Sequence, residues 1–214
     1  MYYKYFNYVL EHKKNVFIEC MKIAIQHEGK IKRQLIIHAF THDLSKFFPC
    51  EFFPYAKYFY GDDGVELEKH WDYEALNNGH SCLSGNYLRC KNKFNKAWEH
   101  HYKHNKHHED YWADKTMPYL YMMQLIADWK GMARKFGDTA QEYYLKNYKK
   151  FNMTYQTRLD LEMNLDINPS PYHNYGHTLE DFANMYDEKT YNNNFDWLKN
   201  KYNIDTYKLL RNKI

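Results

Sequence analysis

The chain has 214 residues, 44% of them hydrophobic and 19% aromatic, which is enough to bury a core and too apolar for an extended disordered chain. Its formal charge of +3 permits an anionic partner, but it is too small to indicate a nucleic-acid-binding protein. The four cysteines lack CxxC spacing, and the longest apolar run, 117–129, is short and interrupted by polar residues, so neither a zinc finger nor a membrane span is expected. We therefore expect a cytoplasmic protein with reduced thiols, and the sequence gives no indication of its oligomeric state.

The segment 2–28 is predicted to be an amphipathic helix, because Val9, Val16 and Cys20 recur at helical spacing. His12 falls on the same apolar stripe and is expected to point towards the core. Taken alone, a histidine in this position is more often a core residue bonded to a backbone carbonyl than a metal ligand.

A second helix is predicted after Gly29 and is expected to run to about Phe47. It carries the adjacent pair His42 and Asp43, followed by Lys46. Burying an unpartnered polar group costs about 2 to 7 kcal/mol, and an isolated charge costs more. The pair therefore indicates a bound metal, and Lys46 is placed to meet a phosphate.

An aromatic helix is predicted over 51–60, and its rings, Tyr55 among them, are expected to form core or pocket wall. From 61 to 93 the pattern loosens into a series of turn signals such as Asn77-Asn78-Gly79. We predict a loop-rich insertion there.

A histidine-rich block follows, with five histidines between His100 and His108 and Trp98 close by. If the block is helical, one face collects four polar side chains: His101, His104, Asn105 and His108. His107 lies close to that face. A solvated surface is the alternative, but this density of imidazoles beside tryptophan favours contact with a metal or a phosphate.

A helix is predicted from 117 to about 137, and its apolar face carries a carboxylate, Asp128. Its position in the middle of the helix argues against a capping role. Two shorter helices are predicted over 138–150 and 154–166. After a proline-containing break, we expect 168–214 to be a short helical appendage to a main domain of 1–167.

The order of His12, His42-Asp43 and Asp128 resembles the signature of the HD-domain superfamily of metal-dependent phosphohydrolases, over about residues 1–137. The resemblance implies an all-α fold, an HD-domain-like helical bundle, in which these four residues hold a metal. Members with two metals use further histidines between the pair and the last aspartate. Here the candidates for the second metal are His101 and His108, followed by His107.

The histidine block also resembles a small family of bacterial and phage proteins described only as a domain of unknown function. The shared pattern is Ala-Trp, two residues, His, three residues, Asn, one residue, His-His, and the family also carries the His-Asp-Leu-Ser-Lys run. It falls on residues 97–108 of this chain.

The HD resemblance implies hydrolysis of a phosphate ester, a nucleotide or a related small phosphorylated molecule, by a metal that activates water. Mixed imidazole and carboxylate ligands suit one or two ions of Mn, Fe, Co, Ni or Zn, and Mg is also compatible. Asp43 would anchor or bridge the metal, Lys46 would hold the phosphate, and Asn105 would hydrogen-bond the substrate. Tyr55 and Trp98 are candidates for stacking on a base.

Two alternatives remain open. One is a metal-stabilised module without catalysis that binds a nucleotide or a protein partner, in phage defence or counter-defence. The other is a di-iron oxygenase of HD fold. Metal content together with turnover on phosphate esters would separate them from a hydrolase.

Overall fold

The structure is a computed structural model and describes residues 1–62 and 85–167. The predicted appendage 168–214 and most of the predicted insertion lie outside these ranges. Within them all regular structure is helical, which confirms the all-α class. The elements in chain order are α1 (Tyr2–Ile25), α2 (Gly29–Thr41), the 3₁₀ helix η1 (Leu44–Phe47), α3 (Pro49–Tyr60), α5 (Gly85–His104), η2 (Glu109–Trp112), α6 (Tyr119–Phe136), α7 (Ala140–Asn147), η3 (Tyr148–Lys150) and α8 (Tyr155–Asn164).

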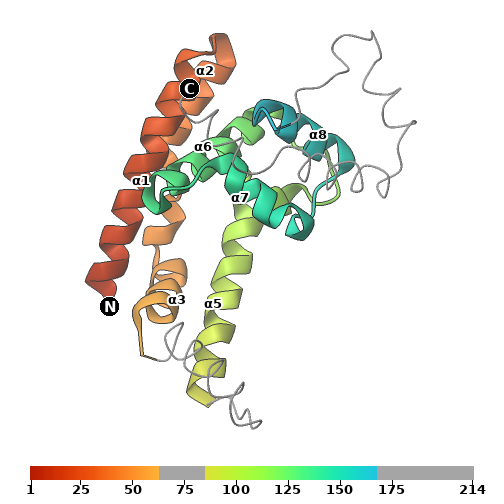
Figure 1. Ribbon diagram of the computed structural model, residues 1–214. Coiled ribbons are helices and arrows are strands. Elements are labelled where there is room, and N and C mark those ends of the chain that lie inside the picture. Colours follow the sequence, from red (N-terminus) through yellow and green to blue (C-terminus); the bar gives the residue numbers. More distant parts are fainter. Residues whose placement is uncertain (63–84, 168–214) are drawn as a thin grey trace.

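The main core forms around α6, which packs against α1, α2 and α7 (Figure 1). Every residue from Met122 to Trp129 is buried, so this helix has no solvated face over two turns. Its partners on α1 include Val16 and Cys20, both without exposed surface. A helix that is buried all round is a rigid place from which to present a polar side chain.

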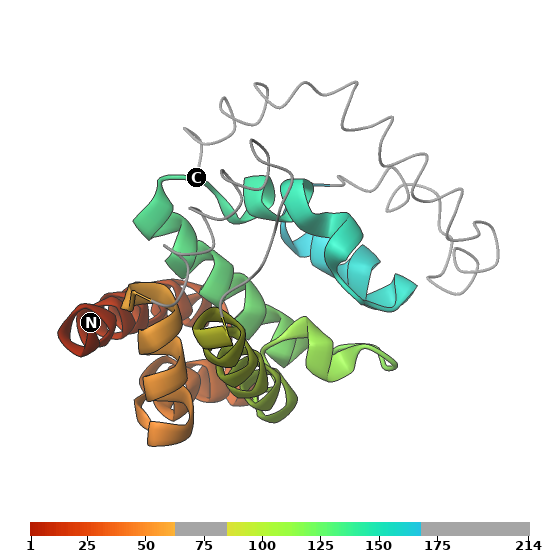
Figure 2. The same cartoon turned by 90° about the horizontal axis from the view of Figure 1, so that it is seen from below.

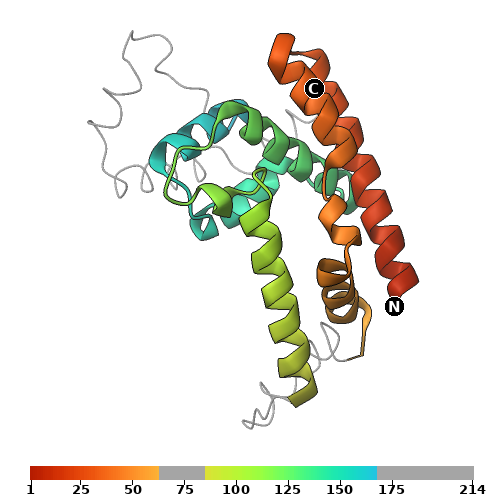
Figure 3. The same cartoon turned by 180° about the vertical axis from the view of Figure 1, so that it is seen from behind.

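A second, aromatic cluster joins α1, α3 and α5. Its buried members are Tyr5 and Val9 on α1, Tyr55 and Ala56 on α3, and Ala97 on α5. Seen from below, the three helices lie side by side with α3 between the other two (Figure 2). The view from behind shows the same order (Figure 3).

The long helix α1 belongs to both clusters. Val9 packs in the aromatic cluster and Val16 in the main core. His12 lies between them on the same stripe and is 3% exposed. The junction of the two clusters is therefore where a polar side chain from α1 is buried.

The second helix ends earlier than its sequence pattern predicts. α2 stops at Thr41, His42 is its C-cap in an extended conformation, and Asp43 has a left-handed φ of 54°. Asp tolerates this conformation better than most residues, and such outliers are held only where the surrounding structure fixes them. The expected helix to Phe47 is wrong because the chain turns at the His-Asp pair.

The histidine block also differs from its predicted helix. α5 runs from Gly85 to His104, so 85–93 is helical and is not part of a loop-rich insertion. His107 and His108 lie beyond the helix, in the turn before η2. The expected single helical face from His101 to His108 is therefore wrong.

The later helices follow their local signals. Thr139 caps α7 in a capping box with Glu142, and Thr154 caps α8. The predicted helices over 138–150 and 154–166 are confirmed, with the last turn of the first one relaxed to η3. In the described ranges no helix is long and apolar enough to cross a membrane.

Candidate metal centre

Three residues that are far apart in sequence meet at the junction of the two clusters. His12 comes from α1, His42 from the end of α2 and Asp128 from α6. The Nε2 atoms of His12 and His42 are 3.1 Å apart. Asp128 Oδ1 lies 3.2 Å from His12 Nε2 and 3.5 Å from His42 Nε2. The predicted convergence of these side chains is thus present in the structure.

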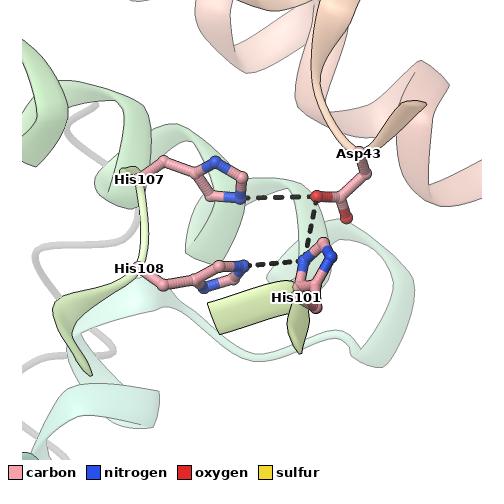
Figure 4. Close-up of side chains that lie close together, drawn as sticks. All are labelled: Asp43, His101, His107 and His108. Atoms are coloured by element: carbon pink, nitrogen blue, oxygen red, sulfur yellow. Dashed lines mark hydrogen bonds and ion pairs between the residues drawn. The ribbon is translucent and has the colours of Figure 1, made fainter. Parts of the chain in front are cut away.

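Asp43 connects this group to the histidine block. Its Oδ2 atom lies 3.4 Å from His12 Nε2 and 3.3 Å from His42 Nε2. Its Oδ1 atom faces the other way, 3.3 Å from His101 Nε2 and 3.4 Å from His107 Nε2 (Figure 4). The left-handed backbone at Asp43 therefore aims one carboxylate between two sets of imidazoles.

His108 completes the second set. Its Nε2 atom is 2.9 Å from His101 Nε2, and its ring points towards the same centre as those of His101 and His107 (Figure 4). The ligand atoms of Asp43 and these three histidines all lie within 4.8 Å of one another, and so do those of His12, His42 and Asp128. The turn after α5 thus brings His107 and His108 to the same centre as His101, which a continuous helix would not do for His107.

The spacing of these atoms fits a metal. Two ligand atoms that each lie about 2.1 Å from a shared ion are about 3.0 Å apart at right angles and about 3.4 Å apart at the tetrahedral angle. The distances among His12, His42, Asp43 and Asp128 run from 3.1 to 3.5 Å. Both oxygens of Asp43, Asp128 Oδ1 and His107 Nε2 are also buried without a hydrogen bond of good geometry to any described residue. A shared cation accounts for both observations.

The protonation states also suit metal binding. Burial opposes the charge on both carboxyl groups, but the facing histidines hold the pKa of Asp43 and Asp128 well below the usual value, with Lys46 contributing at Asp43. Burial lowers the pKa of His42 to about 4, so its imidazole is neutral at pH 7. Burial also opposes the charge on His12, yet Asp128 and Asp43 raise its pKa to about 9. The carboxylates are thus ionised and His42 is neutral, as ligands must be, whereas His12 holds a proton at pH 7 that it must release to bind a metal.

A buried carboxylate outside the cluster holds His101 in place. Glu51, in the first turn of α3, has no exposed surface, and its Oε2 atom accepts a hydrogen bond from His101 Nδ1 at 2.9 Å. Ser45 Oγ donates to the same oxygen at 2.8 Å, and His100 Nδ1 lies 3.0 Å from Oε1. With Nδ1 occupied, His101 presents Nε2 to Asp43, an arrangement typical of metal-binding histidines.

Sequence reasoning missed Glu51. Its only signal is an acidic residue in the first turn of an aromatic helix, and such residues are common for helix-dipole reasons alone. His38 has a comparable place beside His42, because its Nε2 atom lies 3.2 Å from His42 Nδ1.

The remaining predicted site residues do not all lie at the centre. Lys46 Nζ lies 2.5 Å from Asp43 Oδ2, so it is an ion-pair partner of the centre rather than a free ammonium. Asn105 is half-buried and donates to the His101 carbonyl at 2.8 Å. Tyr55 is 3% exposed within the aromatic cluster, so its burial contradicts the predicted stacking on a base. Trp98 is 40% exposed and packs against Tyr102 on α5, and it does not line the pocket described next.

That open side is a pocket of about 240 Å³. Three members of the cluster form part of its lining, namely His42, Asp43 and His107. The other polar side chains in the lining are those of Gln34, His38, Thr41, His104, Asn105, Lys106, Tyr121 and Gln124. The pocket is thus polar and reaches the candidate metal ligands directly.

A buried set of histidines and carboxylates on a helical scaffold defines this chain as a candidate metal-binding helical protein. The chain belongs to a family of unknown function, DUF5662, whose model matches residues 1–168. The match covers all the segments that supply the centre, from α1 to α6. No curated protein and no solved structure gives a significant match to the chain.

Proposed function

We propose that this protein is a metal-dependent hydrolase that cleaves a phosphate ester of a nucleotide or a related small molecule. The observation that carries the proposal is the meeting of two ionised carboxylates and five imidazoles in one buried centre. The five imidazoles belong to His12, His42, His101, His107 and His108. Burying so many polar groups with so few mutual hydrogen bonds is costly unless a cation joins them.

The ligand chemistry narrows the choice of metal ion. Imidazole-rich sites with carboxylates suit Mn, Fe, Co, Ni or Zn, and the two oxygens of Asp43 face different sets of histidines. The centre would therefore hold one or two such ions, with Asp43 between them. When bound, a divalent ion supplies water activation at neutral pH and neutralises charge on a phosphoryl oxygen.

The surroundings support hydrolysis rather than a purely structural metal. A structural site is closed by protein ligands, whereas a catalytic site keeps an open position. Here the pocket reaches His42, Asp43 and His107 and leaves that side of the centre open to a small molecule. Lys46 adds a positive charge beside Asp43, on a side chain that is 16% exposed.

Elemental analysis and a screen of phosphatase, phosphodiesterase and nucleotide substrates test the proposal together. The purified protein should contain about one or two divalent ions per chain, and turnover should vanish with a chelator and return with metal. Asp43→Asn should remove metal while circular dichroism shows an intact helical fold, because the change keeps volume and deletes charge. Asp114→Asn, at an exposed site, is the matched control.

The same measurements decide between this function and its alternatives. Tight metal binding with no turnover of any phosphate ester would support a metal-stabilised binding module. Iron in the purified protein with consumption of oxygen, and no hydrolysis, would support an oxygenase. Unchanged metal content in Asp43→Asn would remove Asp43 from the ligand set.

A further inference from the structure

The pocket beside the candidate metal centre is lined by a mostly buried polar side chain, Gln124, that no described residue bonds. Gln124 lies on α6 one helical turn before Asp128, so both side chains project from the same face of the helix. The residue is 6% exposed and lines the pocket. Its side-chain amide makes no hydrogen bond with any residue that the structure describes.

Neither amide atom of Gln124 is fully enclosed by protein, so a molecule in the pocket can reach the amide. Mostly buried amides are nearly always bonded to protein, ordered water or a ligand. With no protein partner among the described residues, the amide of Gln124 is left to bond whatever occupies the pocket.

The pocket lining also carries a cation. Lys106 is exposed and lines the same pocket, with Nζ 5.7 Å from the centre of the Tyr121 ring and 5.9 Å from that of Tyr111. The ammonium therefore covers the face of Tyr121, the aromatic side chain in the pocket wall on which a base could have stacked.

The size of the pocket limits what enters it. Its volume of about 240 Å³ lies below the range of about 300 to 1,000 Å³ that is usual for drug-sized ligands. Most of its described lining side chains can form hydrogen bonds, one of them is a lysine, and that lysine covers the phenol ring of Tyr121. These features favour a compact, hydroxyl-bearing anion over a nucleobase.

We propose that this pocket is the substrate site, that it takes a small polar phosphate ester such as a phosphorylated polyol, and that Gln124 and Lys106 bind it directly. The amide of Gln124 hydrogen-bonds an oxygen of the substrate, and Lys106 attracts its negative charge. Only the hydrolysis of the bound ester rests on the proposed function. The binding itself can be tested separately.

The test measures binding of inorganic phosphate to the manganese-loaded protein by calorimetry. Gln124→Met keeps the volume and removes the amide. It should leave metal content unchanged, leave the melting temperature unchanged or higher, and weaken phosphate binding about tenfold, as expected for one lost hydrogen bond to a charged group. A residue with a merely structural role would lower the melting temperature instead.

Lys106→Ala provides a second test at an exposed position that cannot unfold the core. It should weaken phosphate binding and reduce the dependence of binding on salt. Lys115→Ala removes the same charge at an exposed site outside the pocket lining and should change neither quantity. Phosphate affinity within about twofold of wild type in both Gln124→Met and Lys106→Ala would overturn the assignment.

Turnover separates this inference from the function on which it rests. A protein that binds phosphate through Gln124 and Lys106 but hydrolyses no ester would support the pocket assignment and refute the hydrolase. A hydrolase that prefers nucleoside monophosphates to phosphorylated polyols of equal charge, with kcat/KM unaffected in Gln124→Met, would refute the pocket assignment and support the hydrolase.

Discussion

The packing of α1 on α6 depends on a glycine that faces a backbone. Gly131 on α6 has no room for a side chain, because a Cβ atom there would lie 2.6 Å from Val16 Cγ2 and 2.9 Å from the Val16 backbone nitrogen on α1. A side-chain methyl group could rotate away, but the nitrogen moves only if the helix moves. Gly131→Ala should therefore push α1 away from α6.

The expected size follows from two opposing effects. Overpacking a well-packed contact costs about 1 to 3 kcal/mol, and the upper part of that range applies because backbone atoms are involved. Alanine recovers about 1 kcal/mol through its higher helix propensity. We expect Gly131→Ala to lower the free energy of unfolding by about 1 to 2 kcal/mol.

Moving α1 away from α6 should also change the metal centre. His12 precedes Val16 by one helical turn and Asp128 precedes Gly131 by nearly one, so separating the helices lengthens the 3.2 Å contact between His12 and Asp128. Gly131→Ala should therefore also weaken metal binding.

Urea unfolding followed by circular dichroism, with and without chelator, measures both effects. The matched control is Gly85→Ala at the start of α5, where an added Cβ meets no described residue within 4 Å. It should be as stable as wild type or slightly more stable. If Gly131→Ala were as stable as wild type and bound metal equally well, the argument that this contact fixes the centre would be refuted.

Three further predictions concern ionisable side chains in the interior. Lys46→Ala should destabilise the metal-free protein by up to about 3 kcal/mol, because it leaves Asp43 with one cation fewer, and added metal should restore most of the loss in a thermal melt; equal losses with and without metal would contradict this. Glu51→Gln should weaken metal binding about 10- to 100-fold in a competition titration, because the Nδ1 atom of His101 loses its carboxylate, and unchanged affinity would remove Glu51 from the site. Burial raises the pKa of Glu162 to about 8 from 4.5, so its contribution to stability is fully present below pH 4.5 and is lost as the pH rises through 8. Glu162→Gln should flatten that decline in urea unfolding between about pH 5 and about pH 8, and an unchanged slope would show that other groups cause it.

Much of the helical framework is predictable from local sequence. The stripe of α1, the capping box at Thr139 and the cap at Thr154 depend on residues within a few positions of one another, and the structure confirms all three. The same periodicity shows that His12 and Asp128 face inward, because a polar residue on an apolar stripe is visible without knowing its partner.

Other features depend on contacts between distant segments. The break at His42 and Asp43 carries no glycine or proline, so a helical pattern continues through it in the sequence. The left-handed turn at Asp43 is stabilised by what its carboxylate meets, namely His101 and His107 from a different element. Local propensity cannot encode that stabilisation.

The sequence by itself therefore determined most of the helices and the burial of His12 and Asp128, since both follow from the spacing of apolar side chains along one segment. Only the tertiary structure decided that Glu51 holds His101, that Lys46 pairs with Asp43 and that the centre opens towards Gln124. These are relations across helices, and they arise when packing fixes the distance between side chains that the chain leaves far apart.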